Sequence, residues 1–215
     1  MVYSGTSMQV GVPPREPLDG SEPDLPVTPY AMQKLAAEEI LKKATANGRV
    51  RGISLRVPTV FGENTVEGGK HDSGVVSAMA RRALEGQALP IWGDGTVRRD
   101  LVHVDDVAAA FTAALAAPGS LVGAHWLLGA GRGDRLGEVF RKMAREMAEH
   151  TGRHPVEVIR AEPPAHAPVT DSLNLVVDST PFRKITGWRP EISLSDGVRR
   201  TVAALTSSVE GKVRT

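Results

Sequence analysis

A predicted helix followed at once by a β-run restricts the fold of this chain more than any other feature. The segment 29–46 predicts a helix, because Thr28 can cap its first turn and Pro29 suits the first helical position. The segment 51–59 is rich in β-branched and aliphatic residues, and the short apolar run 1–4 predicts an earlier strand. Strand, helix and strand in this order require a crossover connection. The pattern therefore predicts a parallel sheet with helices packed against it.

The rest of the chain continues to alternate short β-runs with amphipathic helices, which is typical of α/β layers. Segments that contain Gly and Pro separate these elements. The expected helices span 73–84, 105–118, 136–150 and 195–205, the expected strands lie at 89–92, 100–104, 125–128 and 156–159, the expected loops are 63–72 and 161–174, and 207–215 is an expected tail.

The composition excludes several classes of protein. Acidic and basic residues nearly balance at a formal net charge of +1, without the basic stripe that a nucleic-acid backbone attracts. No apolar run reaches the roughly 18 residues that span a bilayer, and Met1 leads into a β-run instead of a signal peptide. The absence of cysteine excludes disulfides and thiolate catalysis and suits a reducing compartment. We therefore expect a cytoplasmic protein whose partners include neither nucleic acid nor a membrane.

Two residues of the first predicted helix have a chemical use together. Tyr30 and Lys34 stand four positions apart, which places the phenol and the ammonium on one helix face. An ammonium stabilises a phenolate and so makes a tyrosine a better acid–base catalyst near neutral pH. The spacing alone is weak evidence, since an ordinary solvated helix face can also carry it. Thr6, however, ends the first predicted strand, at the carboxyl edge of the sheet where ligands bind.

Five segments in order resemble the extended short-chain dehydrogenases/reductases, the NAD-dependent epimerase/dehydratase family. They are Ser4-Gly-Thr-Ser-Met-Gln-Val-Gly11, Thr28-Pro-Tyr-Ala-Met-Gln-Lys34, Ser54-Leu-Arg-Val-Pro-Thr-Val-Phe-Gly62, Gly93-Asp-Gly-Thr-Val-Arg-Arg-Asp-Leu-Val-His-Val-Asp-Asp106 and Gly187-Trp-Arg-Pro190. The resemblance implies an α/β fold, the C-terminal part of a Rossmann-type parallel sheet with a smaller α/β substrate-binding lobe. Residues 1–62 and 101–149 would belong to the Rossmann part, 63–100 and 150–206 to the lobe, and 207–215 to the tail.

The same resemblance implies a role for each residue of the site. Thr6 would hydrogen-bond the reacting oxygen of a sugar, and Tyr30 would exchange a proton with it. Lys34 would hold the nicotinamide ribose of NAD(P), which is expected to be NADPH, and Pro58 would join Tyr30 and Lys34 in contacting this cofactor.

The substrate implied by the resemblance is a dTDP-sugar. Arg99 would reach its diphosphate, because a guanidinium binds phosphate in a bidentate manner, and Thr59 would contact the sugar nucleotide together with Thr6. Many relatives carry Asn at the position of Thr59, and no arginine in 161–177 supplies the second diphosphate contact that many relatives have. We therefore expect the contacts of this chain with the nucleotide to differ from those of many relatives.

The largest departure lies at the start of the chain. The family opens with a strand, a glycine-rich turn and a helix that together bind the pyrophosphate, and no such opening precedes Thr6. The glycine-rich turn 129–133 lacks that context and is not expected to replace it. We therefore expect the chain to lack the cofactor-binding first half, and by itself neither to bind NADPH tightly nor to reduce a sugar substrate.

The motifs favour one reaction and leave others open. Dehydration is disfavoured because Ser7 and Met8 follow Thr6 where a dehydratase needs a carboxylate pair, and the absence of cysteine excludes the epimerase-reductases that use a Cys and His pair. The details resemble the dTDP-4-keto-6-deoxyhexose 4-ketoreductases of antibiotic deoxysugar biosynthesis. The alternatives are a nucleotide-sugar 4-epimerase and an inactive truncated homologue that serves as a binding or interaction module. A homodimer through the Tyr30 helix would be in keeping with the resemblance.

Other prominent residues are interpreted as structural. Asp106 is expected to cap the helix that follows it. The histidines at 103, 125 and 166 lack metal-ligand spacing, and Trp92 and Trp188 are expected to pack in the core.

Overall fold

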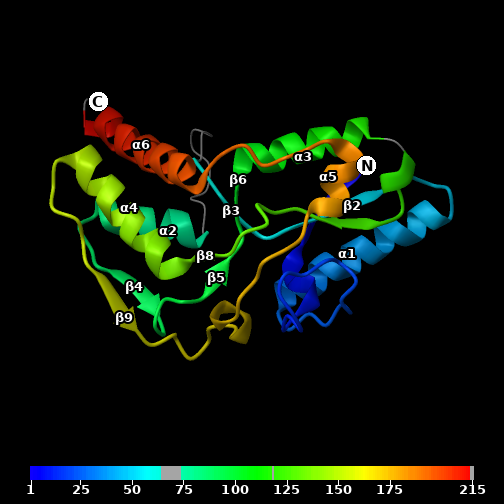
Figure 1. The fold of residues 1–215 in the computed structure, drawn as a ribbon, viewed down its shortest axis with the longest axis horizontal. Coiled ribbons are helices and arrows are strands. Elements are labelled where there is room, and N and C mark those ends of the chain that lie inside the picture. Colours follow the sequence, from blue (N-terminus) through cyan, green and yellow to red (C-terminus); the bar gives the residue numbers. More distant parts are fainter. Residues whose placement is uncertain (64–73, 118, 214–215) are drawn as a thin grey trace.

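Three parallel strands form the sheet of the first lobe, β1 (Val2–Thr6), β2 (Ile53–Val57) and β7 (His125–Leu127), in the order β1-β2-β7. The computed structural model describes residues 1–63, 74–117 and 119–213. In Figure 1, α1 (Pro29–Ala46) lies on one side of this sheet, and α3 (Val104–Ala116) and α5 (Thr180–Thr186) lie on the other. The predicted crossover and parallel sheet are confirmed.

In the second lobe, two helices pack against a two-stranded ribbon and a third helix packs on those two. The helices are α2 (Val75–Leu84), α4 (Leu136–Thr151) and α6 (Leu194–Val213), and the ribbon pairs β4 (Leu89–Trp92) with β9 (Val158–Ala161) in parallel. Apolar side chains at helical spacing on α4, among them Val139, Phe140 and Met143, are buried in this core. The packing expected for that helix is therefore confirmed.

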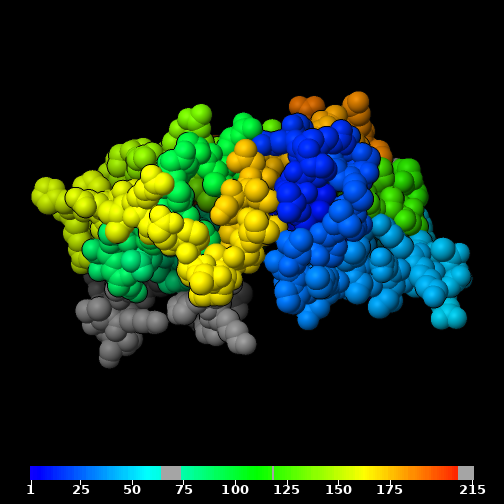
Figure 2. All heavy atoms as spheres, turned by 90° about the horizontal axis from the view of Figure 1, so that it is seen from below, coloured from blue at the N-terminus to red at the C-terminus, as the bar shows by residue number. Residues whose placement is uncertain are grey.

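Short strand pairs and two backbone hydrogen bonds of Leu18 connect the segments that run between the two lobes. β3 (Thr59–Phe61) pairs with β6 (Leu101–His103) in parallel, and β5 (Arg98–Arg99) pairs with β8 (Asp134–Arg135) in antiparallel fashion. The Leu18 amide donates to the Val176 carbonyl at 2.8 Å, and the Asp178 amide donates to the Leu18 carbonyl at 2.7 Å. Figure 2 shows the later segment, in yellow and orange, lying against the N-terminal residues in blue.

The chain departs from the predicted elements in several places. Helix α6 continues to Val213, where a tail was expected from residue 207, and α5 was not predicted. Single turns of 3₁₀-helix lie at η1 (Ser7–Val10), η2 (Gly119–Leu121) and η3 (Val169–Ser172), the last of them inside the expected loop 161–174. The expected loop 63–72, the expected start of a helix at Ser73 and the expected helix stop at Pro118 lie wholly or mostly outside the described residues.

The prediction that Asp106 caps α3 is wrong. The cap is His103, whose Nδ1 accepts a hydrogen bond from the Asp105 amide at 3.2 Å. The Asp106 carboxylate instead accepts from two amides of the segment 191–192, at 2.9 and 3.1 Å, and its carbonyl accepts from the Trp188 indole at 2.9 Å. Asp106 lies one turn too far into the helix to cap it, and it fastens the chain that follows α5.

A buried carboxylate fixes the position of α1 on the sheet. The Glu38 side chain is fully buried and receives hydrogen bonds from Arg56 at 2.7 and 3.1 Å, Ser54 at 2.6 Å, Gln9 at 3.3 Å and Lys42 at 2.7 Å. Burial raises the pKa of Glu38, but the bonds from Arg56 and Lys42 outweigh it, and the pKa is about 2. Its stabilising effect is therefore complete above pH 4.5 and is lost as the pH falls towards 2.

The partner of Glu38 also holds the loop that precedes α1. Arg56 donates two parallel hydrogen bonds to Asp24, at 2.7 and 2.8 Å, in addition to its bonds to Glu38. On the helix side, the Thr28 hydroxyl accepts from the Ala31 amide at 3.2 Å, so the predicted cap is confirmed. One arginine of β2 thus orders both the helix and its approach.

We predict that Arg56→Met lowers the free energy of unfolding by about 3–5 kcal/mol, because it leaves the Glu38 carboxylate buried without its main partner. Urea denaturation at neutral pH measures the change. The matched control is Arg98→Met, which removes a half-exposed arginine that pairs with Glu16 at 2.7 Å, and it should cost only about 0–1 kcal/mol. Equal losses in the two variants would contradict the central role of the Glu38 network.

Candidate active site

Tyr30 and Lys34 meet at the first turns of α1, beside β1. The Lys34 ammonium donates a hydrogen bond to the Ser4 carbonyl at 2.8 Å and lies 5.7 Å from the centre of the Tyr30 ring. The Tyr30 side chain is 56% exposed, so a ligand can reach it. The spacing of four residues therefore brings the phenol and the ammonium together, as the sequence predicts.

Thr6 occupies the carboxyl end of the neighbouring strand. It is the last residue of β1, it is buried, and its hydroxyl accepts from the Met8 amide at 3.3 Å. In the sheet it lies beside Val57, which Pro58 and Thr59 follow directly. Three of the predicted site residues thus gather at one edge of the sheet, and the convergence of the Thr6 and Tyr30 hydroxyls on a single ligand oxygen stays a prediction.

Arg99 lies under the turn η3 and is only 7% exposed. Its guanidinium donates to the carbonyls of Thr170 at 2.8 Å, Asp171 at 2.9 Å and Leu173. No carboxylate of the described residues forms an ion pair with it, and burial lowers its pKa. Its expected contact with a diphosphate stays a prediction, and such a contact would compete with these carbonyls.

The described residues fit part of a nicotinamide cofactor. Lys34 has three N–H donors and gives one of them to Ser4, so the others suit the hydroxyls of a ribose next to Tyr30. The turn 129–133 suits a pyrophosphate less well. Its amides at Ala130 and Gly131 donate to the buried Asp100 carboxylate at 2.7 and 3.0 Å, and burial raises the pKa of Asp100 to about 6.

Tyr3 is a neighbour of the site that the sequence analysis missed. Its hydroxyl donates to the Lys34 carbonyl at 3.1 Å, and its ring centre lies 5.4 Å from the Lys34 ammonium. Burial, together with the charges of Glu38 and Tyr30, raises the pKa of Tyr3 above its usual value. The run 1–4 is too short for alternation to show which of its side chains faces the helix. The Glu38 network was missed too, although Glu38 stands one turn after Lys34 on the same helix.

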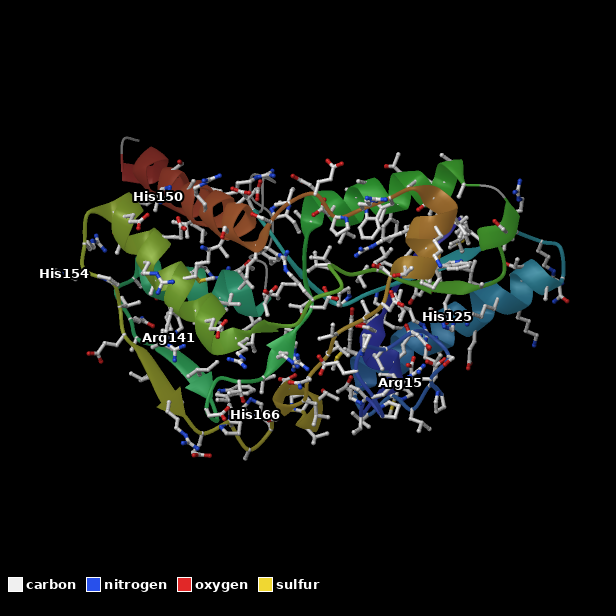
Figure 3. The ribbon with its side chains drawn as sticks, in the orientation of Figure 1. Arg15, His125, Arg141, His150, His154 and His166 are labelled. Atoms are coloured by element: carbon white, nitrogen blue, oxygen red, sulfur yellow. The ribbon has the colours of Figure 1, made fainter. Side chains whose placement is uncertain are left out.

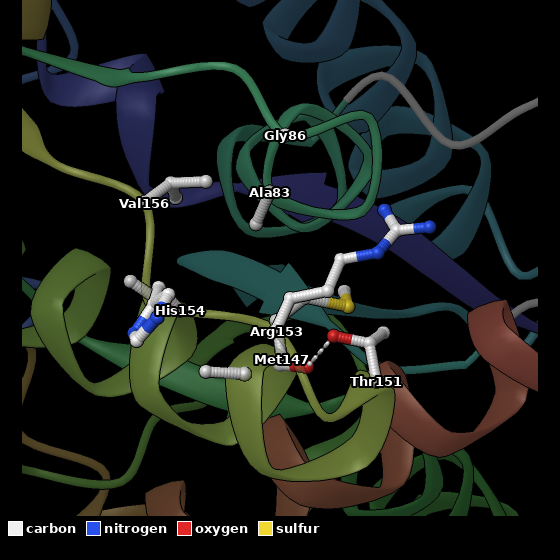
Figure 4. A pocket seen from close by; sticks show the side chains of 9 residues that line it. Ala83, Gly86, Met147, Thr151, Arg153, His154 and Val156 are labelled. Carbon is white, nitrogen blue, oxygen red and sulfur yellow. Dashed lines mark hydrogen bonds between the residues drawn. The ribbon is translucent and has the colours of Figure 1, made fainter.

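Two pockets of the described residues lie away from Tyr30 and Lys34. A pocket of about 20 Å³ between α2 and α4, lined by Ala83, Met147 and Val156 among others, has room for water but not for a sugar (Figure 4). Another, of about 90 Å³, lies beside β7 and is lined by His125 and Asp178 among others.

Of the histidines labelled in Figure 3, His150 and His154 lie at the outer end of the second lobe, whereas His125 lies in the first lobe. Within the part of the chain that the structure describes, no group of His, Asp and Glu could hold a metal ion, and no helix is long and apolar enough to cross a membrane.

Comparisons with known proteins identify the family of the chain. The family model described as "NAD dependent epimerase/dehydratase family" matches residues 1–129. A UDP-glucose 4-epimerase of Mycolicibacterium smegmatis is 30% identical over 89% of this chain and 57% of that protein. A putative UDP-glucose 4-epimerase of Methanocaldococcus jannaschii is 29% identical over 89% of this chain and 58% of that protein.

A solved structure shares the fold. The UDP-glucose 4-epimerase of Thermotoga maritima, with UDP-glucose, matches with a TM-score of 0.81 and 27% identity over 97% of this chain and 63% of that chain. This chain thus spans less than two thirds of each of these three proteins. All three are named as 4-epimerases, so they support the predicted family, whereas the finer likeness to 4-ketoreductases rests on the sequence motifs.

We predict that Tyr3 ionises only above pH 10, because its pKa is raised by burial and by nearby negative charge. The chain has two tyrosines, so Tyr30→Phe leaves Tyr3 as the one phenol that titrates. Phenolate absorbance measured against pH, with circular dichroism to show that the protein stays folded, gives the midpoint. A midpoint at or below that of free tyrosine would contradict the burial of Tyr3 against α1.

Proposed function

The chain belongs to the NAD-dependent epimerase/dehydratase family, and from this premise we propose that it serves NAD(P)-dependent chemistry at carbon 4 of a nucleotide-linked hexose. The observation that carries the proposal is the placement of Tyr30 and Lys34 on α1, next to the carboxyl end of β1. A half-exposed phenol beside an ammonium that no described carboxylate neutralises suits proton exchange with a sugar oxygen.

The residues of this chain divide the work. Tyr30 takes the proton of the sugar 4-hydroxyl while carbon 4 is oxidised, and returns it when carbon 4 is reduced. Lys34 stabilises the phenolate and holds the nicotinamide ribose, Thr6 hydrogen-bonds the reacting oxygen, and Pro58 borders the cofactor. The bound NAD(P) supplies the chemistry of hydride exchange with carbon 4.

The leading candidate reaction is 4-epimerisation, since the relatives reported above are named as 4-epimerases. The second candidate is reduction of the 4-ketone of a dTDP-4-keto-6-deoxyhexose, which the motif Thr6–Gly11 favours by resemblance. Both use the same three side chains. Neither needs the carboxylate pair of a dehydratase, and Ser7 and Met8 do not supply one.

The substrate class that we propose is a UDP- or dTDP-linked hexose. Thr59 stands two residues after Val57, the strand partner of Thr6, near the edge of the sheet where the sugar would sit. Arg99 binds the diphosphate and gives up part of its contact with the carbonyls around η3 to do so. This exchange is favourable because a phosphate neutralises a buried guanidinium, whereas carbonyls do not.

The same proposal includes a homodimer through α1. The outer face of this helix carries apolar side chains at Met32, Ala36 and Ile40, spaced four residues apart, and Ile40 is 70% exposed. A second copy of the chain is a suitable partner, because the same face of both subunits would pack symmetrically around a two-fold axis.

We predict that this chain, joined to the cofactor-binding N-terminal half of a related 4-epimerase and supplied with NAD⁺, interconverts UDP-glucose and its 4-epimer, whereas the 215 residues alone do not. In the joined protein, Tyr30→Phe should lower this rate by roughly 10²–10⁴-fold. NMR of the sugar anomeric protons measures the conversion. The matched control is Glu39→Gln, which alters an exposed residue of the same helix and should keep the wild-type rate.

A second assay separates the two candidate reactions. A 4-ketoreductase consumes one NADPH for each dTDP-4-keto-6-deoxyhexose, which the loss of NADPH absorbance reports, whereas a 4-epimerase shows no net consumption. One of these two assays should show turnover. If Tyr30→Phe keeps the wild-type rate in that assay, the phenol does not have the proposed role.

We predict that Ile40→Glu converts the dimer to a monomer, because it places a charge in the apolar interface. Sedimentation velocity measures the molecular mass. Leu115→Glu on α3 is the control, since Leu115 is equally exposed, at 69%, but lies on a different helix. A wild-type monomer, or equal effects of the two substitutions, would rule out the α1 interface.

A further inference from the structure

The ammonium of Lys34 is held by uncharged groups. It donates to the Ser4 carbonyl and lies 5.4 Å from the Tyr3 ring centre and 5.7 Å from the Tyr30 ring centre. One ring comes from β1 and the other from α1. Both distances are within the range in which a cation is attracted by an aromatic ring.

The carboxylate closest along the helix does not reach Lys34. Glu38 stands one turn further on, but its two oxygens bind Arg56, Ser54, Gln9 and Lys42. Among the described residues, no carboxylate forms an ion pair with Lys34. The ammonium is therefore held in place, but no carboxylate neutralises its charge. A group that stabilises a phenolate needs this unpaired positive charge.

Tyr3 itself is fixed and stays neutral. Its hydroxyl donates to the Lys34 carbonyl at 3.1 Å, which orients the far end of the ring towards α1. A charged Tyr3 would neutralise Lys34 and would compete with Tyr30 for it. Burial against α1 opposes that ionisation.

We propose that Tyr3 is a positioning residue that holds the Lys34 ammonium beside Tyr30 by offering it the face of a neutral ring. The inference rests on the proposed function, in which Lys34 serves Tyr30 and the cofactor ribose. Tyr3 acts through Lys34 and touches neither the sugar nor the cofactor. The ring is the essential part, and the hydroxyl only orients it.

The first test is spectroscopic and needs no turnover. In protein labelled with ¹³C-lysine, the Lys34 CεH₂ protons, assigned with Lys34→Arg, should lie upfield of the other lysines because of ring currents. Tyr3→Phe keeps the ring and should keep most of this shift. Tyr3→Leu and Tyr3→Met, two ringless variants, should lose the part due to Tyr3. An unchanged Lys34 signal in a folded ringless variant overturns the proposal.

The second test is kinetic. The ringless variants should lower kcat by roughly three- to tenfold, the effect expected of one cation–π contact, with little change in the KM of the sugar nucleotide, and Tyr3→Phe should restore kcat. A shifted Lys34 signal with a wild-type kcat overturns the positioning role and leaves the proposed function standing. These rates are measured in the protein joined to the N-terminal half of a related 4-epimerase. If that protein shows no turnover with wild-type Tyr3, the proposed function has failed, and the lysine spectra alone decide whether Tyr3 positions Lys34.

Discussion

The contact between Glu38 and Arg56 is the interaction on which the arrangement of the first lobe depends. Each strand of the sheet turns alternate side chains to α1, and β2 turns Ser54 and Arg56 to it, so the helix meets polar groups where an apolar face would be usual. A buried carboxylate has few places where its charge is satisfied. It therefore selects one rotation and one height of α1 on the sheet. Because Tyr30 and Lys34 lie on the same helix, this placement of α1 also fixes their positions.

The region between the lobes depends on two adjacent residues of opposite charge that do not pair with each other. Arg99 donates to carbonyls around η3, whereas Asp100 accepts from the amides of Ala130, Gly131 and Val177. Asp100 lies between β5 and β6, and the two side chains tie separate segments to this part of the chain. Backbone groups supply the hydrogen bonds of both side chains, although they do not neutralise either charge. The same arrangement leaves Arg99 as a buried cation near the edge of the sheet.

Local patterns predicted those parts of the protein that local chemistry controls. The helix 29–46 has the bounds and the Thr28 cap that its sequence predicts, and Lys34 meets Tyr30 because they are one turn apart. Contacts between distant residues could not be predicted in this way. The acceptors of Arg99 lie more than 70 residues away, and Asp106 has the sequence of a cap but bonds to residues 191 and 192. Nothing in the short run 1–4 indicated that Tyr3 faces Lys34.

The route of the chain between the lobes has a consequence for folding. The core under β2 combines Ile53 and Leu55 with Phe182 and Trp188, and β7 joins the sheet only after the chain has passed through the second lobe. The first lobe therefore cannot complete its core until most of the polypeptide is available, and its contacts carry a large loop-closure entropy. During synthesis, residues 1–62 can complete this core only after the segment that holds Phe182 and Trp188 has been made. We therefore expect the two lobes to fold together as one cooperative unit.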